Sequence, residues 1–136
     1  MSETKNLNHN FPEVPVWDLM GIEVVEMGNG EATLTMPFEE KMTNPYGMMH
    51  GSGVFALADS AVAVAIASIT EKGKQFFTIE MKINYLEPVT SGIVEARAKV
   101  LRQGRIVPGE VDVYNQNKLV AKAIATYIIV DENKKS

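Results

Sequence analysis

The sequence predicts an α+β fold in which one long, buried helix is wrapped by a curved antiparallel β-sheet. Residues 51–70 are rich in alanine and apolar on every side, whereas a helix on a protein surface would show a polar face. The segments on either side alternate apolar and polar residues, as half-buried strands do. A helix that is apolar all round needs cover on all sides, and a curved sheet supplies most of it.

Ahead of this helix we expect, in chain order, a loose polar arm, a short helix, two strands joined by a hairpin, and an irregular segment. The hairpin signal is Gly28-Asn29-Gly30, and the irregular segment ends in a turn with two glycines around His50. The predicted bounds are 1–14 for the arm, 15–20 for the short helix, 22–26 and 32–36 for the strands, and 37–50 for the irregular segment.

Everything after the long helix is predicted to be strand. The first of these strands has its apolar face on the odd-numbered residues from Phe77 to Tyr85, in clean alternation with polar ones. Two shorter strands follow around residues 94–100 and 111–113, then a long final strand over 119–130. The polar tail, 131–136, is expected to be frayed. The whole chain, 1–136, is predicted to be one domain.

Composition excludes several classes of function. The 136 residues contain no cysteine, which rules out disulfide scaffolds, thiolate metal sites and a cysteine nucleophile. The net charge of −4 lacks the basic footprint of proteins that bind nucleic acids or anionic membranes. The N-terminus does not resemble a secretory signal, and Asp59 at the centre of the apolar run opposes membrane insertion. We therefore expect a cytoplasmic protein with no membrane association.

Asp59 is the only ionisable side chain between His50 and Glu71. A carboxylate among apolar residues must be paired, protonated or used in chemistry. The residues alone leave two interpretations open, a catalytic group or a member of a structural hydrogen-bond network.

The residues around the helix start match a known pattern. Asn44-Pro45-x-Gly47-x-x-His50-Gly51, followed by Leu57-Ala58-Asp59, resembles the motif of hotdog-fold acyl-CoA thioesterases, and most closely the phenylacetate-pathway (PaaI-like) branch. The strand that begins at Thr78, the pair Gly104-Arg105 and the segment Leu119-Val120-Ala121 are similar too, so the resemblance covers about residues 20–130. It implies a hotdog fold and hydrolysis of an acyl-CoA thioester without a cofactor.

The same resemblance implies a role for each matching residue. Asp59 corresponds to the catalytic carboxylate, as general base for water or as nucleophile. Gly51 corresponds to the residue whose backbone N–H binds the thioester oxygen, and a helix N-terminus suits an oxyanion because its first amides lack acceptors and carry partial positive charge. Asn44 would position water or the thioester, His50 precedes the glycine, and Thr78 falls where the branch often has a small hydroxyl near the carboxylate.

Three further residues are candidates for binding the substrate. Ser52 stands where the family commonly has a second glycine, so its side chain would narrow the approach to the helix start and alter the acyl preference. The other two are Gly104 and Arg105, which also resemble the family. Arg105, like Lys72, Lys74 and Arg102, flanks a turn where a phosphate of coenzyme A could rest, and a solvated surface position is the simpler role for each of these four. No metal site is expected, because the only histidine besides His50 is His9 in the arm.

Simpler roles are open for the same residues. Gly51 and Asn44 fit a tight turn, and His50 fits a hydrogen-bonding residue that fixes that turn. For the whole chain, the alternative to a thioesterase is a non-catalytic domain that binds or senses acyl-CoA. A hotdog dehydratase or hydratase would need a histidine and a carboxylate arranged for α-proton chemistry, a motif that the sequence lacks.

Helix geometry predicts that the site is shared between two subunits. Gly51 and Asp59 are eight positions apart, which is about 12 Å along a helix axis. A reacting carbonyl must lie roughly 3 Å from both its oxyanion donor and its attacking group, or one water away. Two antiparallel helices related by a two-fold axis would bring Gly51 of one chain beside Asp59 of the other. We therefore expect a homodimer, or a homotetramer made of two such dimers.

Overall fold

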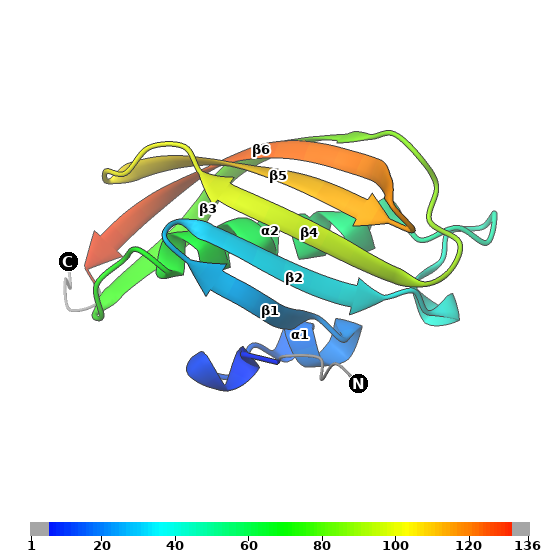
Figure 1. The fold of residues 1–136 in the computed structure, drawn as a ribbon, viewed down its shortest axis with the longest axis horizontal. Helices are drawn as coiled ribbons and strands as arrows, with labels where there is room; N and C mark the ends of the chain where they lie inside the picture. Colours follow the sequence, from blue (N-terminus) through cyan, green and yellow to red (C-terminus); the bar gives the residue numbers. More distant parts are fainter. Residues whose placement is uncertain (1–5, 132–136) are drawn as a thin grey trace.

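The computed structural model describes residues 6–131, in which six antiparallel strands curve around one long helix (Figure 1). The strands lie in the order β1-β2-β4-β5-β6-β3. The helices are α1 (Pro15–Met20) and α2 (Gly51–Ala67), with 3₁₀ turns at Asn8–Asn10 and Glu40–Met42. The strands are β1 (Glu23–Gly28), β2 (Glu31–Pro37), β3 (Lys74–Tyr85), β4 (Ile93–Val100), β5 (Ile106–Asn115) and β6 (Lys118–Asp131). The α+β fold with a sheet-wrapped helix is thus confirmed.

The core lies between α2 and the concave face of the sheet. Leu57, Val62 and Ile66 of α2 are fully buried, and they meet buried residues on β2, β4 and β5, among them Leu34, Val94 and Val111. No helix among residues 6–131 is long and apolar enough to cross a membrane.

The long helix ends one turn earlier than the predicted Thr70. Side-chain hydroxyls compete with the backbone there, because Ser68 Oγ donates to the Ala65 carbonyl and Thr70 Oγ1 donates to the Ile66 carbonyl. Gly73 then turns the chain into β3 with a left-handed φ of 86°. The chain reverses within a few residues, so β3 runs back along the helix that precedes it.

The alternation predicted for β3 holds in only one half of the strand. Met81 and Ile83 pack against the core, but Phe77 and Ile79 are 54% and 53% exposed. The cause is a β-bulge: the pairing steps from Thr78 opposite Tyr127 to Glu80 opposite Thr126, which leaves Ile79 as an extra residue. One inserted residue reverses the face of every side chain before it. The bulge therefore turns Thr78 inward toward α2.

The predicted loose arm is not loose from Leu7 onward. The Leu7 N–H donates to the Val24 carbonyl, and the Asn8 side chain bonds both the Val24 N–H, at 2.8 Å, and the Ile22 carbonyl, at 2.9 Å. Because the Asn8 amide offers a donor and an acceptor, it satisfies backbone groups on the outer edge of β1. Residues 1–5 of the arm lie outside the described residues.

The predicted C-terminal tail, 131–136, begins with a residue that belongs to a strand. Asp131 is the last residue of β6, and its carboxylate forms an ion pair with Lys74, the first residue of β3. Residues 132–136 lie outside the described residues.

Replacing Asn8 with alanine is expected to destabilise the fold by about 1–2 kcal/mol, because two partly buried hydrogen bonds at the edge of β1 are lost. Urea denaturation measures the change. His9→Ala, at the exposed neighbouring position, is the control and should be neutral. Equal stability of the two variants would show that Asn8 does not hold the arm.

Candidate active site

Asp59 lies in the middle of α2 on the face that meets β3 and β6. Its carboxylate oxygen Oδ1 accepts a hydrogen bond from Thr78 Oγ1 at 2.9 Å and another from the Tyr127 hydroxyl at 2.5 Å. The Tyr127 hydroxyl is also 2.9 Å from the main-chain oxygen of Asp59. The structure therefore brings together the two predicted residues, Asp59 and Thr78, and adds a third.

Tyr127 is the residue that sequence reasoning missed. Only 3% of its surface is exposed, and burial followed by the nearby Asp59 carboxylate raises the pKa of its phenol. The group stays protonated, so it remains a hydrogen-bond donor. A tyrosine in an apolar strand is usually core, and the sequence carries no signal that its hydroxyl meets Asp59 across 68 positions.

His50 is the N-cap of α2. Its ring nitrogen Nδ1 accepts a hydrogen bond from the Ser52 N–H at 3.0 Å, and its carbonyl accepts from the Gly53 N–H. The cap thus uses the second and third amides of the helix. The first amide belongs to Gly51 and has no acceptor within a helix. The Ser52 side chain is exposed beside this helix start.

Tyr85, at the end of β3, covers one side of Gly51. Its hydroxyl donates to the Gly51 carbonyl at 2.9 Å, and a Cβ added to Gly51 would lie 3.1 Å from the ring. That is closer than a side chain at this position could lie without moving the tyrosine. Partial burial raises the pKa of Tyr85, so this hydroxyl also remains a donor. A side chain at Gly51 would therefore require the Tyr85 ring to shift by a few tenths of an ångström.

A cavity of about 560 Å³ opens beside the helix start. Gly51, Tyr85 and Asn44 all contribute to its wall, together with apolar side chains that include Met48, Val54 and Val89. The oxygen Oδ1 of Asn44 accepts hydrogen bonds from the N–H groups of Tyr46 and Met48. Asn44 therefore shapes the turn and also borders the cavity.

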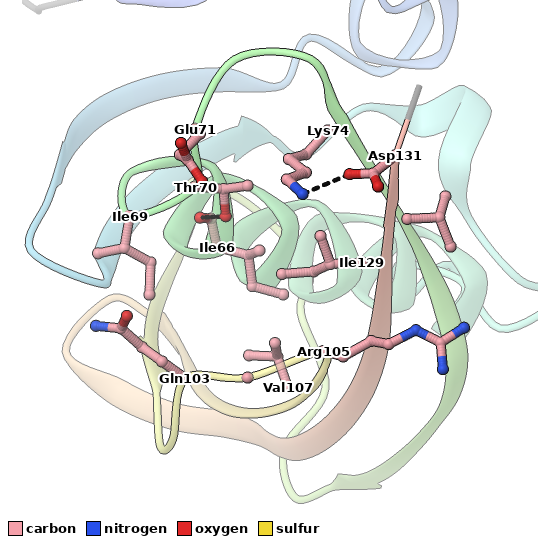
Figure 2. Close-up of a pocket in the computed structure, with 12 residues that line it drawn as sticks. Ile66, Ile69, Thr70, Glu71, Lys74, Gln103, Arg105, Val107, Ile129 and Asp131 are labelled. Atoms are coloured by element: carbon pink, nitrogen blue, oxygen red, sulfur yellow. Dashed lines mark hydrogen bonds and ion pairs between the residues drawn. The ribbon is translucent and has the colours of Figure 1, made fainter. Parts of the chain in front are cut away.

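Gly104 and Arg105 lie at the opposite end of α2 from Gly51. They border a second cavity, of about 460 Å³, formed where the helix stops short of the end of the sheet (Figure 2). Ile66, Val107 and Ile129 form its apolar floor, and Figure 2 shows Lys74 reaching toward Asp131 at its rim. Ser52 and Arg105 of one chain are therefore separated by nearly the whole length of the helix.

Asp59 and Gly51, the two main residues of the predicted site, lie at separate places on one chain. Asp59 provides a carboxylate with one oxygen held by two hydroxyls, and Gly51 provides an uncapped amide at a helix N-terminus. Across residues 6–131 no group of three or more histidine, cysteine, aspartate or glutamate side chains could hold a metal ion.

Comparison with known proteins agrees with this fold. A family model described as "Thioesterase superfamily" matches residues 46–121. The crystal structure of a thioesterase from Haemophilus influenzae is 29% identical, with a TM-score of 0.86 over 98% of this chain and 94% of that one. The phenylacetic acid degradation protein PaaI from Thermus thermophilus, solved as a mutant, is 28% identical, with a TM-score of 0.78 over 85% of this chain and 98% of that one.

A relative is also named for a particular reaction. The 1,4-dihydroxy-2-naphthoyl-CoA hydrolase of Listeria monocytogenes is 30% identical over 88 residues, which are 65% of this chain and 72% of that one.

The chain belongs to the thioesterase superfamily, and its fold is the hotdog fold of that family. Within it the chain is PaaI-like, and its class of activity is thioester hydrolysis.

Proposed function

We propose that the protein hydrolyses an acyl-CoA thioester to the free acid and coenzyme A, with Asp59 as the attacking group or its base. The observation that supports this most is the Asp59 carboxylate, which two hydroxyls hold in place in the middle of an otherwise uncharged helix. Coenzyme A as the carrier is supported by the relative named as a naphthoyl-CoA hydrolase. A cytoplasmic enzyme is part of the same proposal.

In the first form of the reaction, Asp59 removes a proton from water and the hydroxide oxygen attacks the thioester carbon. The carbonyl oxygen becomes an oxyanion, which the Gly51 N–H stabilises at the helix N-terminus. When the oxyanion collapses, the C–S bond breaks and the thiolate of coenzyme A takes up the proton that Asp59 removed from water. In the second form, the carboxylate itself attacks the thioester carbon, the C–S bond breaks and the thiolate of coenzyme A leaves, which gives a mixed anhydride of Asp59 and the acyl group. Water then hydrolyses the anhydride to the free acid, restores the Asp59 carboxylate and supplies the proton that the thiolate takes up.

Two chains are proposed to build each site, and the two edges of the sheet support a dimer. The N-terminal arm occupies the outer edge of β1 at Val24. The opposite edge is β3, twelve residues long, which within residues 6–131 pairs only with β6. A long open edge with exposed Phe77 and Ile79 is a place for pairing with another strand.

The contacts of β3 support a particular two-fold arrangement. Thr78 touches Asp59, and Tyr85 touches Gly51. If two β3 strands pair antiparallel about a point between Met81 and Lys82, Thr78 of one chain faces Tyr85 of the other. Asp59 of one chain then lies beside Gly51 of its partner, on the same side of a continuous sheet. Gly51 and Asp59, which are about 12 Å apart along one helix, would thus meet as residues of two different chains.

Asn44 and His50 would belong to the same proposed site as Gly51. Asn44 lies at the cavity wall, and His50 caps the helix through the Ser52 N–H, so the Gly51 N–H is left for the substrate. Ser52 is exposed at the entrance, where it would limit the acyl group. In the chain that supplies Asp59, Gly104 and Arg105 lie near the C-terminal end of α2, beyond Asp59. The phosphates of coenzyme A would be bound there.

Release of free thiol from a panel of acyl-CoA esters tests the proposal. Aromatic, short, medium and long acyl groups belong in the panel, and at least one of them should give turnover that depends on Asp59. The competing function is a non-catalytic acyl-CoA sensor. Measurable binding of an acyl-CoA without thiol release from any member of the panel would favour the sensor.

A further inference from the structure

We infer that Tyr127 and Thr78 act together as positioning residues, holding Oδ1 of Asp59 so that Oδ2 is the oxygen presented to the thioester or to water. The inference rests on the proposed function, and it assigns a role to Tyr127 that the family motif does not contain.

Both hydroxyls reach the same carboxylate oxygen. Thr78 and Tyr127 are directly opposite each other on β3 and β6, and their hydroxyls donate to Oδ1 at 2.9 and 2.5 Å. Among residues 6–131, all hydrogen bonds of this carboxylate go through Oδ1. Two donors on one oxygen fix the plane of the carboxylate and leave the lone pairs of Oδ2 available.

The fold departs from regular geometry at this point. Without the bulge at Ile79, a strand that buries Met81 and Ile83 would turn Thr78 to the outer face. With the bulge, Thr78 faces α2, while Phe77 and Ile79 are exposed on the other side. Bulges occur often beside active sites, where they re-aim a side chain. Here the side chain that is re-aimed is a donor to Asp59.

A purely structural explanation accounts for less of this geometry. A buried tyrosine needs a partner for its hydroxyl, and the main-chain oxygen of Asp59 at 2.9 Å would suffice. The shorter contact of Tyr127 is to the carboxylate, and Thr78, which is exposed and has water available, makes the same contact. Both hydroxyls therefore serve the Asp59 carboxylate.

Other polar groups near Asp59 have partners elsewhere. Glu80 of β3 bonds the hydroxyl of Thr126, which strand alternation places on the opposite face. From α1, Trp17 bonds Ser60, the neighbour of Asp59 in α2. Thr78 and Tyr127 are therefore the two donors whose removal tests the positioning role.

The test compares Tyr127→Phe and Thr78→Val with the wild-type chain by steady-state kinetics. Each variant should lose about tenfold in kcat and keep KM within about twofold, because the carboxylate is misplaced while the substrate still binds. Thr78→Ser keeps the donor and should restore the wild-type kcat. Tyr114→Phe, a partly buried tyrosine on β5, is the matched control and should change neither quantity.

Unchanged kcat in folded Tyr127→Phe and Thr78→Val would overturn the inference. So would an equal loss of kcat in Thr78→Ser, because a variant that keeps the donor should keep the turnover. Should Tyr127→Phe fail to fold, Thr78→Val and Thr78→Ser decide by the same criteria, since Thr78 is exposed. If Asp59→Asn is inactive while Tyr127→Phe and Thr78→Val keep the wild-type kcat, the proposed function stands and only the positioning role is lost.

Discussion

Asp59→Asn is expected to lower turnover by about 10²–10⁴-fold while the protein stays folded. The substitution keeps size and shape, and an asparagine oxygen still accepts hydrogen bonds from Thr78 and Tyr127. It removes the charge that deprotonates water or attacks the thioester. Stability should hold or rise, because a partly buried carboxylate costs desolvation energy. Thiol release and a thermal melt measure the two effects.

Asp18→Asn is the matched control for that substitution, since it removes a carboxylate from the exposed side of α1. It should leave turnover unchanged. Near wild-type turnover in folded Asp59→Asn would remove Asp59 from the chemistry and leave it a structural role.

Gly51→Val is expected to reduce turnover by about 10²–10³-fold, the usual effect of losing one oxyanion donor. The added side chain would occupy the space next to the first amide of α2, and its Cβ would lie 3.1 Å from the Tyr85 ring. The thioester oxygen could then no longer approach the N–H. Thiol release, with circular dichroism to confirm the fold, measures the change.

A clash with Tyr85 alone would give the same loss, and a second comparison separates the two causes. In a Tyr85→Ala background the clash disappears, so Gly51→Ala should still reduce turnover relative to Tyr85→Ala if the glycine admits the substrate. Equal activity of Tyr85→Ala and of the double variant that also carries Gly51→Ala would show that the glycine only makes room for Tyr85.

The fold could be predicted from the sequence because its elements follow local patterns. The alanine-rich run after His50 and the alternating strands have periods that differ clearly, and Gly28-Asn29-Gly30 gives a two-residue hairpin with left-handed φ angles at Asn29 and Gly30. A bulge has no comparable pattern. The apolar residues Phe77 and Ile79 fit regular alternation, so the sequence alone predicts the wrong face for them.

The candidate site could be predicted only where it is contiguous in the chain. Asp59 is conspicuous as a lone carboxylate in an apolar helix, and the helix start is marked by glycines. Tyr85 and Tyr127 lie 34 and 68 positions from the groups they bond, and their hydroxyls meet those groups only because β3 and β6 lie against α2. Arg105, predicted to bind the substrate, lies beside the second cavity, and its role in coenzyme A binding remains a prediction.

The measurement that tests the central claim most directly is complementation between two inactive variants. Gly51→Val and Asp59→Ala chains are unfolded together and refolded, so that random pairing makes half of the dimers mixed. Each mixed dimer has one site with an intact Gly51 from one chain and an intact Asp59 from the other. The shared-site account predicts recovery of about a quarter of wild-type activity. Mixed dimers that are verified by mass and remain inactive would contradict it.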